Sequence, residues 1–170
     1  MPLTLDATPK GANSNSYATR AEADSYFEGR RNADTWTAAT AAEKDQALVA
    51  ATTRLEQESY KASRTTSEQR LKWPRIWVET DDDYLTWYDS DTIPRVVKEA
   101  CYELALASLN AGTTDPQADT GMEGFDHVQV GPLAVDINHA FRGGQLPASV
   151  TRLIRHVSIS ISGTVRLIRS

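Results

Sequence analysis

The 170-residue sequence contains very little cysteine and no long apolar segment. Its single cysteine, Cys101, excludes a disulfide within the chain and suits a reducing compartment. No apolar run approaches the roughly 20 residues that a membrane-spanning helix requires, and the N-terminus lacks the basic and apolar blocks of a secretion signal. We therefore expect one globular domain with no membrane partner.

The sequence also lacks the short motifs that mark catalytic and metal-binding sites. It contains no Gly-x-Ser-x-Gly nucleophile elbow and no phosphate-binding loop. Its histidines, His127, His139 and His156, are scattered, and neither Cys-x-x-Cys nor His-x-x-x-His spacing occurs. Nothing in the arrangement of the carboxylates singles out an acid–base pair. We therefore expect a protein that is not an enzyme and has no catalytic residue, cofactor or metal ion.

Carboxylate side chains are missing from the last 34 residues of the chain, because the final one belongs to Asp136. Residues 137–170 carry a net charge of +5, whereas residues 1–136 carry −10. An acidic body and a basic end are complementary, so copies could associate head to tail, although the asymmetry could also be an accident of composition. The acidic total disfavours a protein whose main task is to coat nucleic acid.

Two capping signatures predict the first two helices. Thr19 followed by Glu22 opens one helix, which ends at Gly29, and Thr40 followed by Glu43 opens another that runs to about residue 59. Leu48, Ala51 and Leu55 form the apolar stripe of the second helix. Trp36 precedes the second cap and is expected to pack against the start of that helix.

A third and stronger helix is predicted after Ile93-Pro94 and before Gly112, because proline is favoured in the first turn of a helix. Apolar residues cover most of its circumference, so it must be buried on more than one face. It therefore lies either at the centre of a helical bundle or against another subunit. A shorter helix is predicted to start at Pro147.

Strand signals interrupt the helical pattern in three places. Residues 76–78 and 84–88 are aromatic and β-prone, which predicts a hairpin. Residues 125–130 and 133–137 flank Gly131-Pro132 and predict a second hairpin. Residues 157–162 alternate serine with apolar side chains and should pair with another sheet edge. The expected fold is mainly α: three main helices, a short C-terminal helix, one or two small β-hairpins and an extended C-terminal tail.

The tip of the first hairpin is strongly acidic. The simplest interpretation is a solvated turn, since charge runs usually face water. A second interpretation, which depends on the family resemblance given below, is the lining of a channel whose negative walls would repel the phosphates of passing DNA. A divalent-metal site is the third and weakest, because the tract lacks the glycine and distal glutamate of a calcium loop. The residues concerned are Glu79, Asp81, Asp82 and Asp83.

Several short sequence motifs follow one another along the chain in an order that is shared with a known protein family. Asn13-Ser14-Asn15-Ser16-Tyr17 leads into Thr19-x-x-Glu22-Ala23-Asp24-x-Tyr26-Phe27, and Leu71-Lys72-Trp73-Pro74-Arg75 and an acidic turn follow. The pattern closes with Ile93-Pro94-x-x-Val97-Lys98-x-Ala100 and Glu103-Leu104-Ala105. Over roughly residues 13–109 the chain resembles the head-to-tail connector adaptor proteins of tailed bacteriophages. Relatives of this pattern often carry the label DnaT-like single-stranded-DNA-binding.

The resemblance implies a structural virion protein, made in the host cytoplasm and located at the head-tail junction. It implies a homo-oligomeric ring, typically a dodecamer, between the portal protein and a stopper or tail protein, through which double-stranded DNA passes without specific binding. The implied organisation is an N-terminal arm (1–18), a helical adaptor core (19–111), a loop and β-hairpin (112–145) and a C-terminal helix with a portal-docking tail (146–170). The basic ending would dock on the portal through Val165, Arg166, Leu167, Ile168 and Arg169.

The residues of the resemblance have two possible roles. Trp73, Pro74 and Arg75 either fix a corner of the fold or anchor a subunit contact, and the corner is favoured because Pro74 excludes a helical Trp73. Ile93, Pro94 and Glu103 are expected either to maintain the helical motif or to lie at the subunit interface. The alternative function is a single-stranded-DNA-binding replication module, with Trp77, Trp87 and Tyr88 as stacking platforms.

Overall fold

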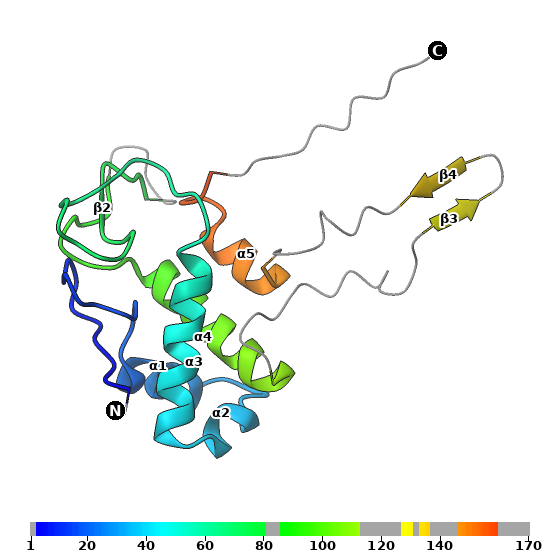
Figure 1. Ribbon diagram of the computed structural model, residues 1–170, viewed down its shortest axis with the longest axis horizontal. Helices are drawn as coiled ribbons and strands as arrows, with labels where there is room; N and C mark the ends of the chain where they lie inside the picture. The colour runs from blue at the N-terminus through cyan, green and yellow to red at the C-terminus, as the bar shows by residue number, and fades with distance from the viewer. Residues whose placement is uncertain (1–2, 81–85, 113–126, 131–132, 137–145, 160–170) are drawn as a thin grey trace, which may run out of the picture.

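The computed structural model describes residues 3–80, 86–112, 127–130, 133–136 and 146–159, and within them the chain is mainly helical, as predicted (Figure 1). In the described part, no helix is both long and apolar enough to cross a membrane. In chain order the elements are α1 (Arg20–Glu28), α2 (Asp34–Ala38), α3 (Ala41–Leu55), β1 (Ser63–Arg64), β2 (Arg75–Ile76), α4 (Arg95–Ala111), β3 (His127–Val130), β4 (Leu133–Asp136) and α5 (Ala148–Ile154).

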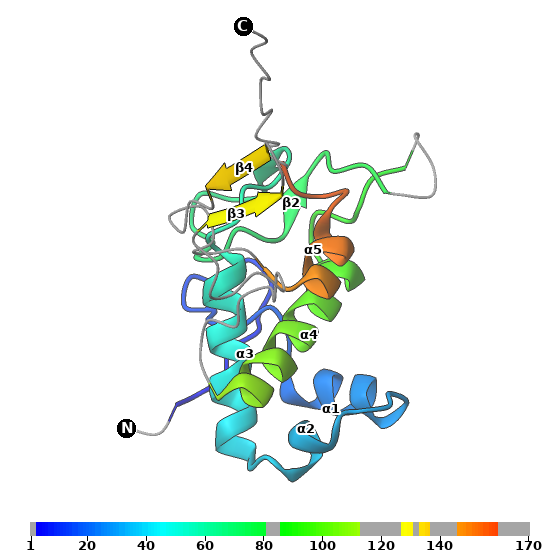
Figure 2. The ribbon, with the colours of Figure 1, turned by 90° about the vertical axis from the view of Figure 1, so that its right-hand side faces the viewer.

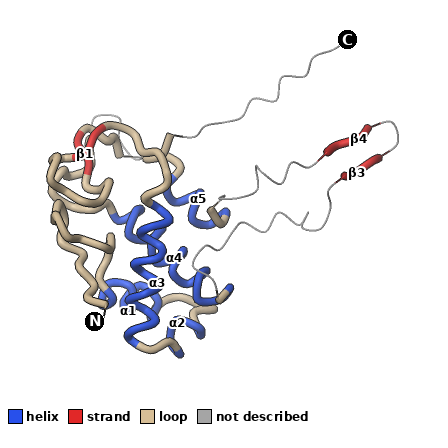
Figure 3. Tube along the Cα trace, in the orientation of Figure 1, coloured by secondary structure: helices blue, strands red, loops and turns tan. Residues whose placement is uncertain are grey.

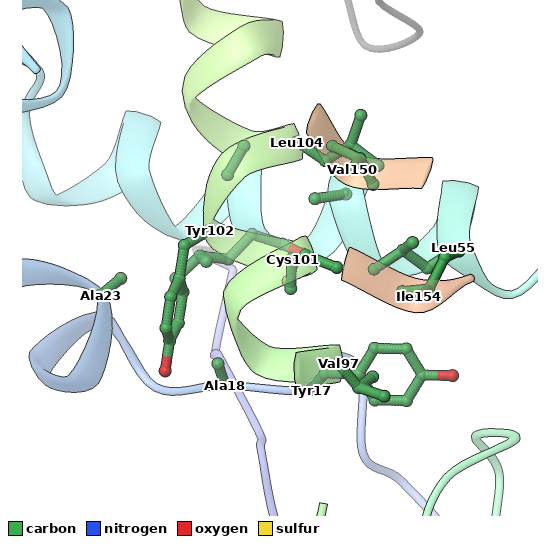
Figure 4. Packing of buried hydrophobic residues seen from close by; sticks show 14 of the residues in the cluster. Tyr17, Ala18, Ala23, Leu55, Val97, Cys101, Tyr102, Leu104, Val150 and Ile154 are labelled. Atoms are coloured by element: carbon green, nitrogen blue, oxygen red, sulfur yellow. Dashed lines mark hydrogen bonds between the residues drawn. The ribbon is translucent and has the colours of Figure 1, made fainter. Parts of the chain in front are cut away.

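Helix α4 is the centre of the bundle, the first of the two positions that its sequence allowed. It packs against α3 on one side and α5 on another, and it also contacts α1 and α2 (Figure 2). Figure 4 shows Leu104 and Cys101 of α4 beside Val150 and Ile154 of α5 and Leu55 of α3. All five side chains are buried, and each aliphatic one contributes about 1.5–3 kcal/mol through its removal from water.

Cys101 is fully buried, as expected for a small apolar residue of this helix. Its sulfur lies 3.5 Å from Thr52 Oγ1. Burial raises the pKa of the Cys101 thiol to about 12, so the reactive thiolate is scarce at neutral pH.

Both predicted capping boxes are present. Thr19 and Thr40 accept hydrogen bonds from the N–H groups of Glu22 and Glu43, and each glutamate accepts one in return from the threonine N–H. Helix α2 was not predicted. Residues 32–34 seemed to end a helix, but Asp34 begins this short one, and it brings the buried Trp36 onto Phe27.

Glu22 gives the fold one acid-sensitive contact, because Lys98 of α4 donates to its carboxylate. Partial burial alone would raise the pKa of Glu22, but hydrogen bonds from Lys98 and Thr19 outweigh it and hold the pKa below its ordinary value. This contribution to stability is complete above about pH 4.5 and is lost as pH falls through the lowered folded-state pKa.

We therefore expect the unfolding free energy of the Glu22→Gln variant to depend less on pH below 4.5 than that of the wild type. Urea unfolding at a series of pH values measures this dependence. The slopes of unfolding free energy against pH should differ by the equivalent of up to about one bound proton. Glu28→Gln, which removes an exposed carboxylate from the same helix, is the control. Equal pH dependence in all three proteins would contradict the assignment.

The strands form two small antiparallel pairs, of which β3 and β4 are seen as arrows in Figure 1 and in red in Figure 3. The hairpin around Gly131-Pro132 is confirmed, with β3 paired to β4. The first predicted hairpin forms in part: Glu79 pairs with Trp87, and the Tyr88 N–H donates to the Val78 carbonyl at 2.9 Å. Strand β2 pairs instead with β1, a strand that was not predicted.

The C-terminal helix begins after Pro147 as predicted. Beyond it, the chain pairs with the segment that follows α3. Tyr60 and Ser158 form an antiparallel bridge, the Lys61 N–H donates to Val157, and the Ile159 N–H donates to Ser59 at 2.8 Å. The sheet edge predicted for this ending is therefore supplied, up to Ile159, by the same chain.

Candidate functional site: a basic groove and an exposed tryptophan pair

Trp73, Pro74 and Arg75 form a buried corner of the fold. The Trp73–Pro74 peptide bond is cis, the Trp73 indole is buried, and its ring meets Tyr60 edge-on at 5.5 Å. An indole enclosed by its own chain cannot anchor a second subunit. The packing of Trp73 therefore supports the structural role, in which it fixes a corner of the fold.

Arg75 holds this corner together. Its Nε donates to the Lys61 carbonyl at 2.7 Å, Nη1 to Lys72 at 3.1 Å, and Nη2 to the carbonyls of Tyr60 and Ala62. Burial lowers the pKa of Arg75, but a guanidinium remains charged at physiological pH. A fixed positive charge therefore lies between the 60–62 segment and Lys72, with carbonyl oxygens as its partners.

The other residues of the motif lie elsewhere in the core. Ile93 is buried, and Pro94 caps α4 instead of occupying its first turn. Glu103 is also buried. It accepts a hydrogen bond from the Tyr26 hydroxyl at 2.6 Å and forms an ion pair with Arg30. The motif thus marks positions that support the fold, and the structure does not gather them into one site.

Most of the remaining predicted site residues lie outside the described part of the chain. Of the acidic tip, only Glu79 is described, and it is exposed; Asp81, Asp82 and Asp83 are not. The predicted docking residues Val165, Arg166, Leu167, Ile168 and Arg169 also lie outside the described residues. Within the described ranges, no three His, Cys, Asp or Glu side chains converge as metal ligands would.

Trp77 and Trp87 form an exposed aromatic pair. Their side chains are 71% and 49% accessible, and the rings meet at 88° with centroids 5.9 Å apart. Trp77 has φ +60°, a conformation that costs a bulky residue free energy and is found most often at functional positions. Tyr88, predicted as a third platform, is half-buried, and its hydroxyl is bonded to His156 Nε2 at 2.7 Å.

Beside the buried corner lies a basic groove of about 700 Å³. Four cations and a single carboxylate, Glu56, line it, in an otherwise acidic protein. The remaining lining residues are small, aromatic or apolar, and include Ile159. Trp77 follows strand β2 directly, and β2 carries one of the four cations. These cations are Arg64, Arg70, Lys72 and Arg75.

Residues 61–72 are basic and polar, but no site was predicted for them from the sequence. The signal was present as four cations, at 61, 64, 70 and 72, within twelve residues that hold only Glu68 as a carboxylate. What the sequence could not show is that β1 pairs with β2, which brings Arg64 opposite Arg75.

Comparison with known proteins gives one match. A family model described as "Putative DnaT-like ssDNA binding protein" matches residues 1–170. No curated protein and no solved structure matches the chain. The match extends the resemblance predicted over residues 13–109 to the whole sequence, and it carries the label of the alternative function, not a connector description. The chain belongs to the family of putative DnaT-like ssDNA-binding proteins.

Proposed function

We propose that this protein binds single-stranded DNA, and the observation that carries the proposal is the exposed Trp77–Trp87 pair. Large aromatic side chains are mostly enclosed in folded proteins, as Trp36 and Trp73 are here. An exposed indole offers a face on which any unpaired base can stack. The family description points to the same class of ligand.

Loss of both indoles should weaken the binding of a labelled oligothymidylate by at least about tenfold. Stacking contributes roughly 1–3 kcal/mol per base, and about 1.4 kcal/mol corresponds to a factor of ten. Fluorescence anisotropy of the Trp77→Ala/Trp87→Ala variant at low salt measures the change. Because both side chains are exposed, the variant should unfold at nearly the wild-type temperature.

The control is Leu3→Ala, which removes another exposed apolar side chain and should leave affinity unchanged. A duplex of matched sequence should bind more weakly than the single strand, since its bases are already stacked. Wild-type affinity in the double tryptophan variant, or no detectable binding by the wild type at low salt, would contradict the proposal.

A second candidate function is a head-to-tail adaptor of a phage virion, and it is favoured by the separation of charge along the chain. Residues 1–136 carry −10 and residues 137–170 carry +5. In such a ring the acidic residues Glu79, Asp81, Asp82 and Asp83 would face passing DNA. The basic ending Val165–Arg169 would bind in a groove of the portal protein that has an acidic rim.

The two candidates differ in what the protein assembles with. An adaptor should be found in purified virions, and electron microscopy or light scattering should show rings of the protein, alone or on the portal. A protein that stays monomeric with the portal present and is absent from virions would contradict the adaptor. Tight oligonucleotide binding at physiological ionic strength would favour the single-stranded-DNA function instead.

A further inference from the structure

We infer that the basic groove is a phosphate-binding track for the backbone of a single strand whose bases stack on the tryptophan pair. The inference rests on the proposed function and adds a second, chemically different site to it. It assigns the binding of phosphates to Arg64, Arg70 and Lys72, with Arg75 as a buried supporting charge.

Carboxylates do not neutralise the groove cations Arg64, Arg70 and Lys72 in the described structure. Elsewhere in the described structure, seven cations form ion pairs with carboxylates: Lys10, Arg20, Arg30, Lys44, Arg54, Arg95 and Lys98. Arg64, Arg70 and Lys72 form none with any described residue. Lys61, Arg31, Arg152 and Arg155 are likewise unpaired there, but they do not line the groove.

Backbone carbonyls orient two of the groove cations. Arg64 Nη1 donates to the Gln69 carbonyl at 3.2 Å, and Lys72 Nζ donates to the Glu58 carbonyl at 2.8 Å. Carbonyl oxygens position these side chains without cancelling their charge. Within the described residues, the Nε and Nη2 donors of Arg64 and Arg70 have no partner, which leaves them able to bind a phosphate.

Glu56 is the carboxylate that lines the groove. Its Oε1 accepts a hydrogen bond from the buried Tyr17 hydroxyl and another from the Lys72 N–H at 2.8 Å. One oxygen of the Glu56 carboxylate is thus held by Tyr17 and by the backbone of the groove wall. The exposed cations Arg64 and Arg70 therefore set the potential that an approaching anion meets.

The groove favours a nucleic acid strand over an acidic peptide because of its neighbour. Strand β2 runs from Arg75 in the groove wall to Ile76, and the next residue is the exposed Trp77. Single-stranded nucleic acids are bound by a positive groove that follows the backbone together with aromatic side chains that take the bases. An acidic peptide would use the cations but would have no need of the indoles.

The test is the salt dependence of oligothymidylate binding by the Arg64→Gln/Arg70→Gln variant. Each phosphate contact contributes about 0.7 to the slope of log K against log salt for a single strand, so removing two should reduce the slope by about 1.4. The control, Arg31→Gln/Arg152→Gln, removes the same charge from exposed, unpaired sites away from the groove. Its slope should stay close to the wild-type value.

Each outcome separates this inference from the proposed function. If the wild type binds the oligonucleotide and the groove and control variants have equal slopes, the phosphate track is wrong while the function stands. If the wild type does not bind at low salt, the function fails and the track fails with it. Polyglutamate that competes as well as oligothymidylate at equal charge would overturn the assignment to nucleic acid. Circular dichroism should show that both double variants are folded.

Discussion

The Arg75→Ala variant is expected to lose about 3–5 kcal/mol of unfolding free energy. The guanidinium satisfies four backbone carbonyls, from Tyr60, Lys61, Ala62 and Lys72. A buried acceptor left without a partner costs about 1–3 kcal/mol. Water from the adjoining groove can reach some of these oxygens, so the total stays below the sum of four such penalties. Urea denaturation of the purified variant measures the loss.

Arg64 provides a matched control because it is the register partner of Arg75 across the β1–β2 pair. Arg64 is exposed and donates to one carbonyl, so Arg64→Ala should change stability by no more than about 0.5 kcal/mol. Arg75→Lys should fall between the two, since a compact ammonium cannot reproduce the planar fork. Similar losses in Arg64→Ala and Arg75→Ala would show that the carbonyl network is not what fixes the corner.

Replacing Trp36 by alanine is expected to cost about 3–5 kcal/mol, the range for removing a buried aromatic side chain. Its ring packs on Phe27 with centroids 4.8 Å apart, and Lys44 Nζ lies 5.4 Å from the ring centroid. The indole Nε1 also donates to Asp24 at 2.9 Å. The deletion therefore leaves a cavity between α1 and α2 and removes a hydrogen bond at its rim.

Trp87→Ala makes the same chemical change at a side chain that is half exposed, and it should cost less than about 1 kcal/mol. Trp36→Phe keeps most of the packing and loses only the bond to Asp24, so its loss should be near 1 kcal/mol. Thermal unfolding followed by circular dichroism compares the three variants. A Trp36→Ala protein as stable as Trp87→Ala would refute the buried role of this residue.

Local signals in the sequence predicted most of the helices. The capping boxes at Thr19 and Thr40, and prolines just before α4 and α5, each depend on residues within one turn. Helix α2 was missed because Asn32–Asp34 has loop composition, the helix has no side-chain cap, and the burial of Trp36 that stabilises it is a tertiary contact. Strand β1 was missed because its partner, β2, lies about twelve residues further along the chain. One residue of that partner is the buried Arg75.

The candidate site was harder to predict than the fold. Trp77 and Trp87 were named as stacking platforms from their residue type, but only the structure shows how far each indole is exposed. The groove cations were visible as a basic stretch. Their freedom from carboxylate partners, however, depends on where Glu56 and Glu58 point, and that follows from the packing of Tyr17 and Arg54.

The bridge between Tyr60 and Ser158 has a consequence for the timing of synthesis. Residues 59–61 form one side of the Arg75 corner, and they are pinned by a segment made almost a hundred residues later. A nascent chain that has not yet been extended to residue 159 lacks this pairing, although α1 to α4 can already associate. Competence of the groove is thus deferred until residue 159 has been synthesised, because a contact so distant in sequence closes late.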